Sequence, residues 1–167
     1  MATRDGGEGG IRLSVLDRLI DDEPGLGAPP EHAASGSVEE FRASVLRDLE
    51  WLLNTRRTIE EPPEDFPEVR SSLYCYGSPD ISSMSGDSPT ARRTLARHLQ
   101  ELIRTFEPRL TGVRVAMEEE GDGGAKQLRF VIEGMLRLDS GPERVSFDTV
   151  LEVTSGKFFV SGGGGHA

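Results

Sequence analysis

The stretch SPTARRTLARHLQELIRTFEPRLTGVRVAM, residues 88–117, decides how the chain folds. It opens with serine and proline, a pair typical of a helix N-terminus, because serine caps free amides and proline lacks the amide that would stay unpaired there. From Val113 to Met117, apolar and polar residues alternate, which predicts a half-buried strand. Between these ends, apolar residues recur at helical spacing and predict one buried stripe: Leu95, Leu99, Leu102, Ile103 and Phe106.

The corner between this helix and this strand reads Glu107-Pro108-Arg109. The proline pushes Glu107 out of the helical region, so the helix ends there. Two opposite charges then flank the proline where a buried helix turns into a sheet, and buried charges are costly unless they are paired or hydrogen-bonded. Two interpretations stay open. The corner is a structural clasp, with Arg109 bonding helix carbonyls and Glu107 bonding loop amides, or it is a contact point for a partner chain.

Two more strands are predicted downstream. Gly134 interrupts the first of them and indicates a bulge or the close approach of another backbone. An apolar patch, residues 157–160, follows the second and has no place in the alternating pattern. Together with the helices, these strands predict an α+β fold, a small antiparallel meander packed against helices. The inward-facing residues are Leu128, Phe130, Ile132, Leu136 and Leu138, then Val145, Phe147, Thr149, Leu151 and Val153.

The N-terminal part predicts two helices of different kinds. Ser37 and Glu40 have the spacing of a capping box, so a long helix begins after Ser37. Before it, residues 11–20 form a short amphipathic helix that is either a docking peptide or packs on its own domain. We therefore expect a flexible arm over 1–36, one folded domain over 37–160 and a disordered tail over 161–167. The apolar residues of the possible docking helix are Leu13, Leu16, Leu19 and Ile20.

Composition limits the possible functions. The net charge of −10 over 167 residues argues against general binding to nucleic acid or to anionic lipid. A single cysteine, Cys75, excludes an internal disulfide and fits a reducing compartment. No apolar run is long enough to span a membrane and no signal peptide is recognisable, so we expect a cytoplasmic protein.

No sequence motif indicates an enzyme. The chain has no phosphate-binding glycine loop after a strand, no nucleophile elbow and no histidine or cysteine spacing for a metal, so no cofactor is expected. Glu107 is the one acid whose setting could perturb it. A glycosidase acid requires a raised pKa and a second carboxylate across a cleft, whereas Arg109 would lower the pKa of Glu107.

Four segments carry a resemblance to a known family. They occur in the order LDRLIDDEP (16–24), DLEWLLNTRR (48–57), SLYCYGSPD (72–80) and FEPRL (106–110). Together they resemble TssE, the baseplate subunit of bacterial type VI secretion systems, which is similar to the lysozyme-like wedge protein of contractile phage tails. The resemblance implies a structural protein that joins other wedge subunits and starts polymerisation of the contractile sheath, in a cytoplasmic baseplate docked at the inner membrane complex. It also implies that Glu107, Pro108 and Arg109 hold the subunit against its wedge partners.

Two alternatives are weighed against this reading: a muramidase built on Glu107, and a small regulatory binding module similar to an anti-adaptor. A further hypothesis concerns strand exchange, which the resemblance implies for sheath subunits. Strand edges offer unpaired backbone groups to a new chain. We expect the strand over 144–153, helped by the patch after it, to exchange strands with the first sheath ring, unless that patch caps the protein's own core. The residues of this possible contact are Val145, Phe147, Leu151, Phe158 and Phe159.

Overall fold

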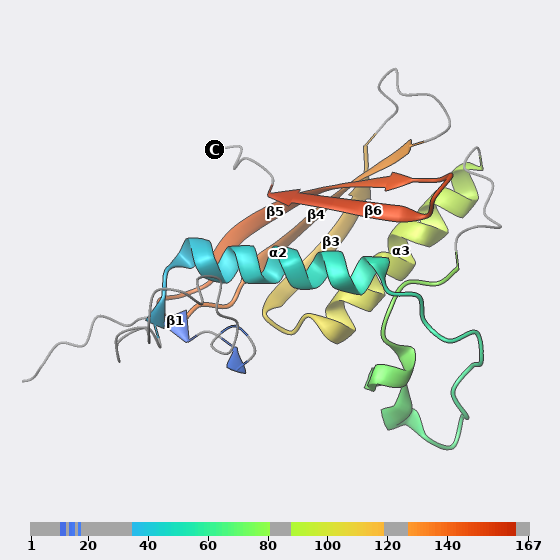
Figure 1. The fold of residues 1–167 in the computed structure, drawn as a ribbon, viewed down its shortest axis with the longest axis horizontal. Coiled ribbons are helices and arrows are strands. Elements are labelled where there is room, and N and C mark those ends of the chain that lie inside the picture. The colour runs from blue at the N-terminus through green and yellow to red at the C-terminus, as the bar shows by residue number, and fades with distance from the viewer. Residues whose placement is uncertain are drawn as a thin grey trace, which may run out of the picture.

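The computed structural model describes residues 11–12, 14–15, 17, 35–80, 88–118 and 127–162. Within them, two long helices lie against one face of a four-stranded antiparallel sheet (Figure 1). This two-layer arrangement confirms the predicted α+β class. The helices are α2 (Val38–Asn54) and α3 (Pro89–Phe106), and the sheet has the order β3 (Leu110–Met117), β4 (Gln127–Leu136), β5 (Glu143–Glu152) and β6 (Lys157–Gly162). Two short strands, β1 (Ile11–Arg12) and β2 (Ser35–Gly36), pair with each other.

The core forms between the sheet and the two helices, where the predicted stripes meet. Inward-facing residues of β4 and β5 are buried, including the two central aromatic side chains Phe130 and Phe147. Each fully buried side chain of this size contributes about 1.5–3 kcal/mol of hydrophobic free energy. The helices contribute Phe41, Val45, Leu49, Leu52 and Leu53 from α2, and Leu95, Leu99 and Ile103 from α3.

Both helix starts agree with the sequence. The Ser37 hydroxyl accepts a hydrogen bond from the amide of Glu40, and the Glu40 carboxylate accepts one from the amide of Ser37. Ser88 caps α3 through the amide of Ala91, with Pro89 as the first helical residue. The predicted capping box and serine–proline start are therefore confirmed.

Strand β3 starts three residues before the alternation that predicted it. The alternating pattern begins at Val113, but β3 begins at Leu110, so Gly112 lies inside the strand. The pairing register shifts between Thr111 and Arg114, and Gly112 has a φ of 63° within this bulge. Opposite the bulge, a Cβ on Gly134 would lie 3.3 Å from the carbonyl oxygen of Thr111. The expected close approach of another backbone at Gly134 is confirmed.

The C-terminal strand corrects two predictions. Residues 157–160 do alternate, because they form β6, in which Phe158 is fully buried and Phe159 is 46% exposed. The chain turns back at Gly156 and adds this strand beside β5, so β5 is paired on both sides. In this fold β5 therefore has no free edge at which to exchange strands with another chain. Val145, Phe147, Leu151 and Phe158 instead fill the protein's own core.

The boundary of the C-terminal tail also moves. β6 continues to Gly162, so residues 161 and 162 belong to the sheet and not to a tail that starts at 161. The remaining residues of the predicted tail lie outside the described residues. So do the four apolar residues assigned to the docking helix, Leu13, Leu16, Leu19 and Ile20.

Residues 57–80, called the lobe here, project from the body between α2 and α3 (Figure 1). The lobe contains two short 3-10 helices, η1 (Pro67–Ser71) and η2 (Leu73–Cys75). Neither of them buries a residue. Among the described helices, none is both long and apolar enough to cross a membrane.

Candidate functional site: the E-P-R corner network

The corner residues Glu107 and Arg109 bind each other. The Nε and Nη2 atoms of Arg109 donate hydrogen bonds to the two carboxylate oxygens of Glu107, at 2.7 and 2.5 Å. The backbone amide of Arg109 donates a third to the same carboxylate, at 3.2 Å. The side chain of Glu107 is only 4% exposed and that of Arg109 is 19% exposed. This two-pronged geometry is the strong form of an arginine–carboxylate pair.

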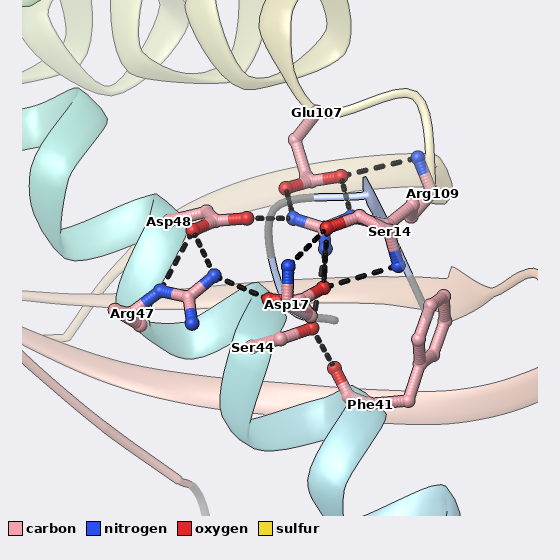
Figure 2. A network of polar contacts seen from close by, with 8 residues as sticks. All are labelled: Ser14, Asp17, Phe41, Ser44, Arg47, Asp48, Glu107 and Arg109. Carbon is pink, nitrogen blue, oxygen red and sulfur yellow. Dashed lines mark hydrogen bonds and ion pairs between the residues drawn. The ribbon is translucent and has the colours of Figure 1, made fainter. Parts of the chain in front are cut away.

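The same guanidinium also joins the corner to α2 (Figure 2). Its Nη2 atom contacts Asp48 Oδ2 at 2.5 Å, and its Nη1 atom donates to the Ser44 hydroxyl at 3.2 Å. Ser44 in turn donates to the carbonyl oxygen of Phe41 at 2.8 Å. The guanidinium carbon lies 5.8 Å from the centre of the Phe41 ring, within the range of a cation–π contact. Arg109 thus connects the α3–β3 corner to the middle of α2.

A second arginine extends the network to the N-terminal segment. Arg47 donates to Asp48 Oδ1, and its Nη2 atom contacts Asp17 Oδ1 at 2.6 Å. Asp17 also lies 3.9 Å from Arg109 and has a side chain that is 6% exposed. Ser14 and Asp17 bond each other in the reciprocal manner of a capping box, with the hydroxyl of Ser14 2.6 Å from Asp17 Oδ2. Figure 2 shows Asp17 between the two arginines.

The charges of this network stabilise one another. Burial opposes the charged form of Arg109, but the hydrogen bonds and charge of Glu107, then those of Asp48, outweigh it and raise the pKa of Arg109. Burial would raise the pKa of Asp17, yet its bonds to Ser14 and Arg47 hold that pKa below the ordinary value. Opposite charges and hydrogen bonds to the charged form act in this direction. Folding therefore favours the charged forms of Arg109 and Asp17.

Segments that are far apart in the sequence meet at this network. Asp17 comes from LDRLIDDEP, Asp48 from DLEWLLNTRR, and Glu107 with Arg109 from FEPRL. The fourth segment contributes Tyr76, whose pKa is raised by burial and by the negative charges of Asp48 and Glu107. The Tyr76 ring packs edge-on against Phe106 at a centroid distance of 5.4 Å.

The clasp interpretation of the corner is confirmed in outline, with different bonds. Glu107 does accept the expected loop amide, that of Arg109. The guanidinium of Arg109, however, binds carboxylates and the Ser44 hydroxyl rather than the helix carbonyls that we expected. Of the three corner residues, only Pro108 is exposed. The sequence did not reveal Asp17, Arg47, Asp48 and Ser44 as parts of the site, because no spacing rule links residues that are up to 92 positions apart.

The corner offers poor chemistry for a glycosidase. Both oxygens of Glu107 are held by Arg109, whereas a general acid must hold a proton for the leaving group. In the part of the chain that the structure describes, no group of three histidine, cysteine or acidic residues is arranged to hold a metal ion. A structural role fits this arrangement.

A comparison with protein-family models agrees with this architecture. The model of the baseplate wedge protein gp25 family matches residues 39–140, more than half of the chain, and the chain therefore belongs to that family. The protein is a baseplate structural component of this class. The matched range contains α2, α3 and the corner, while Asp17 lies before it.

Comparisons with individual proteins add less. A chain in a solved structure titled "The baseplate complex from the type VI secretion system" is similar at 22% identity and a TM-score of 0.48, over 67% of this chain and 94% of that one. Among curated proteins, none matches this chain.

Proposed function

We propose that the chain is a wedge subunit of a type VI secretion baseplate that joins other wedge subunits and starts sheath polymerisation. The observation that carries the proposal is the convergence of all four resembling segments on the corner network, inside a chain of the gp25 family. The E-P-R residues then act on partners mainly by shape. They fix α2, the corner and the N-terminal segment relative to one another, and Pro108 is their exposed contact point.

Sheath initiation needs an open strand edge, and the two edges of the sheet differ. At the β3 edge, side chains of α3 form hydrogen bonds with outward-facing backbone groups of the strand. Arg104 donates to the carbonyl of Val113 at 2.8 Å, and Gln100 Oε1 accepts from the amide of Val115 at 3.2 Å. This edge is therefore blocked for an incoming strand.

The β6 edge is bonded by a side chain at Phe158 but, among the described residues, not at Val160. The Asn54 side-chain amide accepts from the amide of Phe158 and donates to its carbonyl, both at 2.9 Å. These backbone groups of Phe158 therefore point away from β5. Since backbone direction alternates along a strand, the N–H and C=O of Val160 point the same way. We propose that a sheath strand pairs with β6 around Val160, where the exposed ring of Phe159 lies beside it.

A proline at position 160 tests this edge. Val160→Pro removes an outward N–H and no bond to β5, so the domain should stay folded, as proline is tolerated on edge strands. In cells that assemble sheaths, we expect this variant to melt normally, to co-purify with wedge subunits and to form few sheaths. Val160→Thr, which keeps the N–H, is the matched control. Normal sheath number with Val160→Pro would contradict the strand-pairing proposal, and failure of the wild-type chain to bind any wedge subunit would contradict the wedge proposal itself.

The proposal includes the absence of murein-cleaving activity. Because Arg109 occupies both oxygens of Glu107, purified protein should give no clearing on peptidoglycan gels above a buffer blank. Clearing that disappears in Glu107→Gln would favour the muramidase reading instead.

A further inference from the structure

The lobe exposes apolar side chains to an unusual extent. Seven large apolar side chains are exposed among the described residues, and four of them belong to a single stretch of the lobe, residues 59–74. Ile59 is 92% exposed and Leu73 is 84% exposed. Single exposed apolar residues are normal, but a concentration of them on one element indicates an interaction site. The four residues are Ile59, Phe66, Leu73 and Tyr74.

The lobe has a defined structure although its apolar side chains are exposed. Tyr74 donates to Glu60 at 3.4 Å, and Arg57 pairs with Glu61 at 3.1 Å. The base of the lobe is fixed by two backbone bonds, from the amide of Ser78 to the carbonyl of Thr55 and from the amide of Arg57 to the carbonyl of Ser78. The backbone is thus held in place while its apolar side chains remain uncovered.

The charge around these side chains identifies the chemistry of a partner. Glu64 and Asp65 precede Phe66 directly, and Glu68 follows two residues later; all three are exposed. The carboxylates of these three residues make no ion pair and no hydrogen bond within the described residues; Glu68 accepts one only at its backbone carbonyl, from the Ser71 hydroxyl. A partner that covers Phe66 would place its own flanking residues beside these acids. Lysine or arginine is favoured there, and like charges would be repelled.

A hollow beside the lobe supplies room for an anchoring side chain. Its volume is about 360 Å³, and it lies between the lobe and α3. Its lining is mixed: Pro62 and Cys75 from the lobe and Leu102 and Phe106 from α3 lie among charged side chains that include Arg57, Arg70 and Glu101. Interfaces obtain most of their binding energy from a few apolar anchors in such pockets.

We propose that the lobe and this hollow dock a basic amphipathic segment of another protein, one that carries apolar side chains flanked by lysine or arginine. This surface is separate from the corner network and from the β6 edge. The docking proposal for the lobe therefore does not depend on whether the chain initiates the sheath.

The first test uses the full chain and a synthetic probe, a fluorescent 18-residue amphipathic peptide made of leucine and lysine. We expect the double variant Phe66→Ser/Leu73→Ser to weaken binding at least about tenfold, the loss typical of removing an interface anchor. Phe159→Ser removes an aromatic ring from β6 that is 46% exposed, against 58% for Phe66, and should leave the affinity for this peptide unchanged. A leucine–glutamate peptide with the same apolar face should bind more weakly than the lysine peptide.

The second test separates the lobe from the overall negative charge. The triple variant Glu64→Gln/Asp65→Asn/Glu68→Gln should weaken binding more than Glu39→Gln/Glu118→Gln/Asp139→Asn, which removes the same charge from exposed positions elsewhere. The proposal is overturned if the lysine peptide does not bind, if the double variant binds it as the wild type does, or if both charge variants lose affinity equally. Unchanged melting temperatures of the lobe variants establish that any loss is not unfolding.

Discussion

The corner network and the lobe both depart from the usual distribution of side chains. The corner buries charged groups, and the lobe exposes apolar ones. At the corner, Glu107 and Asp17 are almost completely buried although they are charged. On the lobe, Ile59 and Leu73 are almost completely exposed although they are apolar. The two regions are neighbours in the fold, since Tyr76 at the end of the lobe is influenced by the charges of the corner.

The difference shows which kind of binding each region can do. The buried charges already have partners within the chain, so the corner holds segments of this protein together. The exposed apolar groups have no such partners, so the lobe has free energy available for another molecule. On our proposals, the E-P-R corner mainly organises the chain itself, with Pro108 as its exposed contact point, and the lobe serves contact with another protein.

The largest effect that could break this comparison is expected at Arg109. Arg109→Ala leaves Glu107 without its cation and Asp48 with Arg47 alone in a partly dry site, and breaking such a buried pair typically costs about 3–5 kcal/mol. We expect a loss of this size in the free energy of urea unfolding. Arg129→Ala, which removes an exposed arginine of β4, should change it by less than about 0.5 kcal/mol. Equal effects would mean that the corner is not an internal clasp, and assembly would have to be studied directly.

The second-largest loss of stability is expected at Gly77, where the lobe joins the body. Gly77 has a φ of 112°, and a Cβ there would lie 2.4 Å from the carbonyl oxygen of Thr55. Gly77→Ala should therefore lower the free energy of unfolding by about 2–3 kcal/mol through strain and a backbone clash. Gly141→Ala is the matched control, because Gly141 has a φ of 126° with nothing near its missing Cβ. A loss no greater than that of the control would show that the lobe base is not tightly packed.

A smaller effect is expected at Asp17. Asp17→Asn removes a charged acceptor from Arg47 and should cost about 1.5–3 kcal/mol near neutral pH. Because the pKa of Asp17 is lowered by folding, its contribution is present above the pKa of the unfolded chain and is lost as the pH falls through the lowered folded pKa. The difference in unfolding free energy between wild type and variant should therefore shrink in acid. An acid-independent difference would argue that the Asp17 charge plays no part.

The smallest stability effect is expected on the lobe. Leu73→Ala should change the free energy of unfolding by less than about 0.5 kcal/mol, since the side chain buries nothing within its own chain. Leu99→Ala, the same substitution in the core stripe of α3, should cost about 2–5 kcal/mol. Thermal and urea unfolding of the pair measure the contrast directly. A large loss of unfolding free energy in Leu73→Ala would mean that Leu73 makes an internal contact. The lobe would then not be a free surface.

Much of the fold was predictable from local signals. The capping box at Ser37, the serine–proline start of α3, the helical stripes and the alternation of β4 and β5 all depend on residues a few positions apart, and each is present. The predictions failed where a distant segment decides the outcome. Phe158 and Phe159 looked irregular alone, but their alternation became clear once β6 was paired with β5.

The site divides in the same way. Local sequence was enough to place Glu107 and Arg109 at a helix–strand corner and to require that they be paired, because proline ends helices and buried charges are costly. The folded structure adds what local sequence does not carry: Asp48, Ser44 and Asp17 complete the pairing, side chains of α3 bond the backbone of the β3 edge, and β6 forms the other edge of the sheet. The physical reason is that hydrogen bonds and charges act over a few ångströms of space, whatever the separation along the chain.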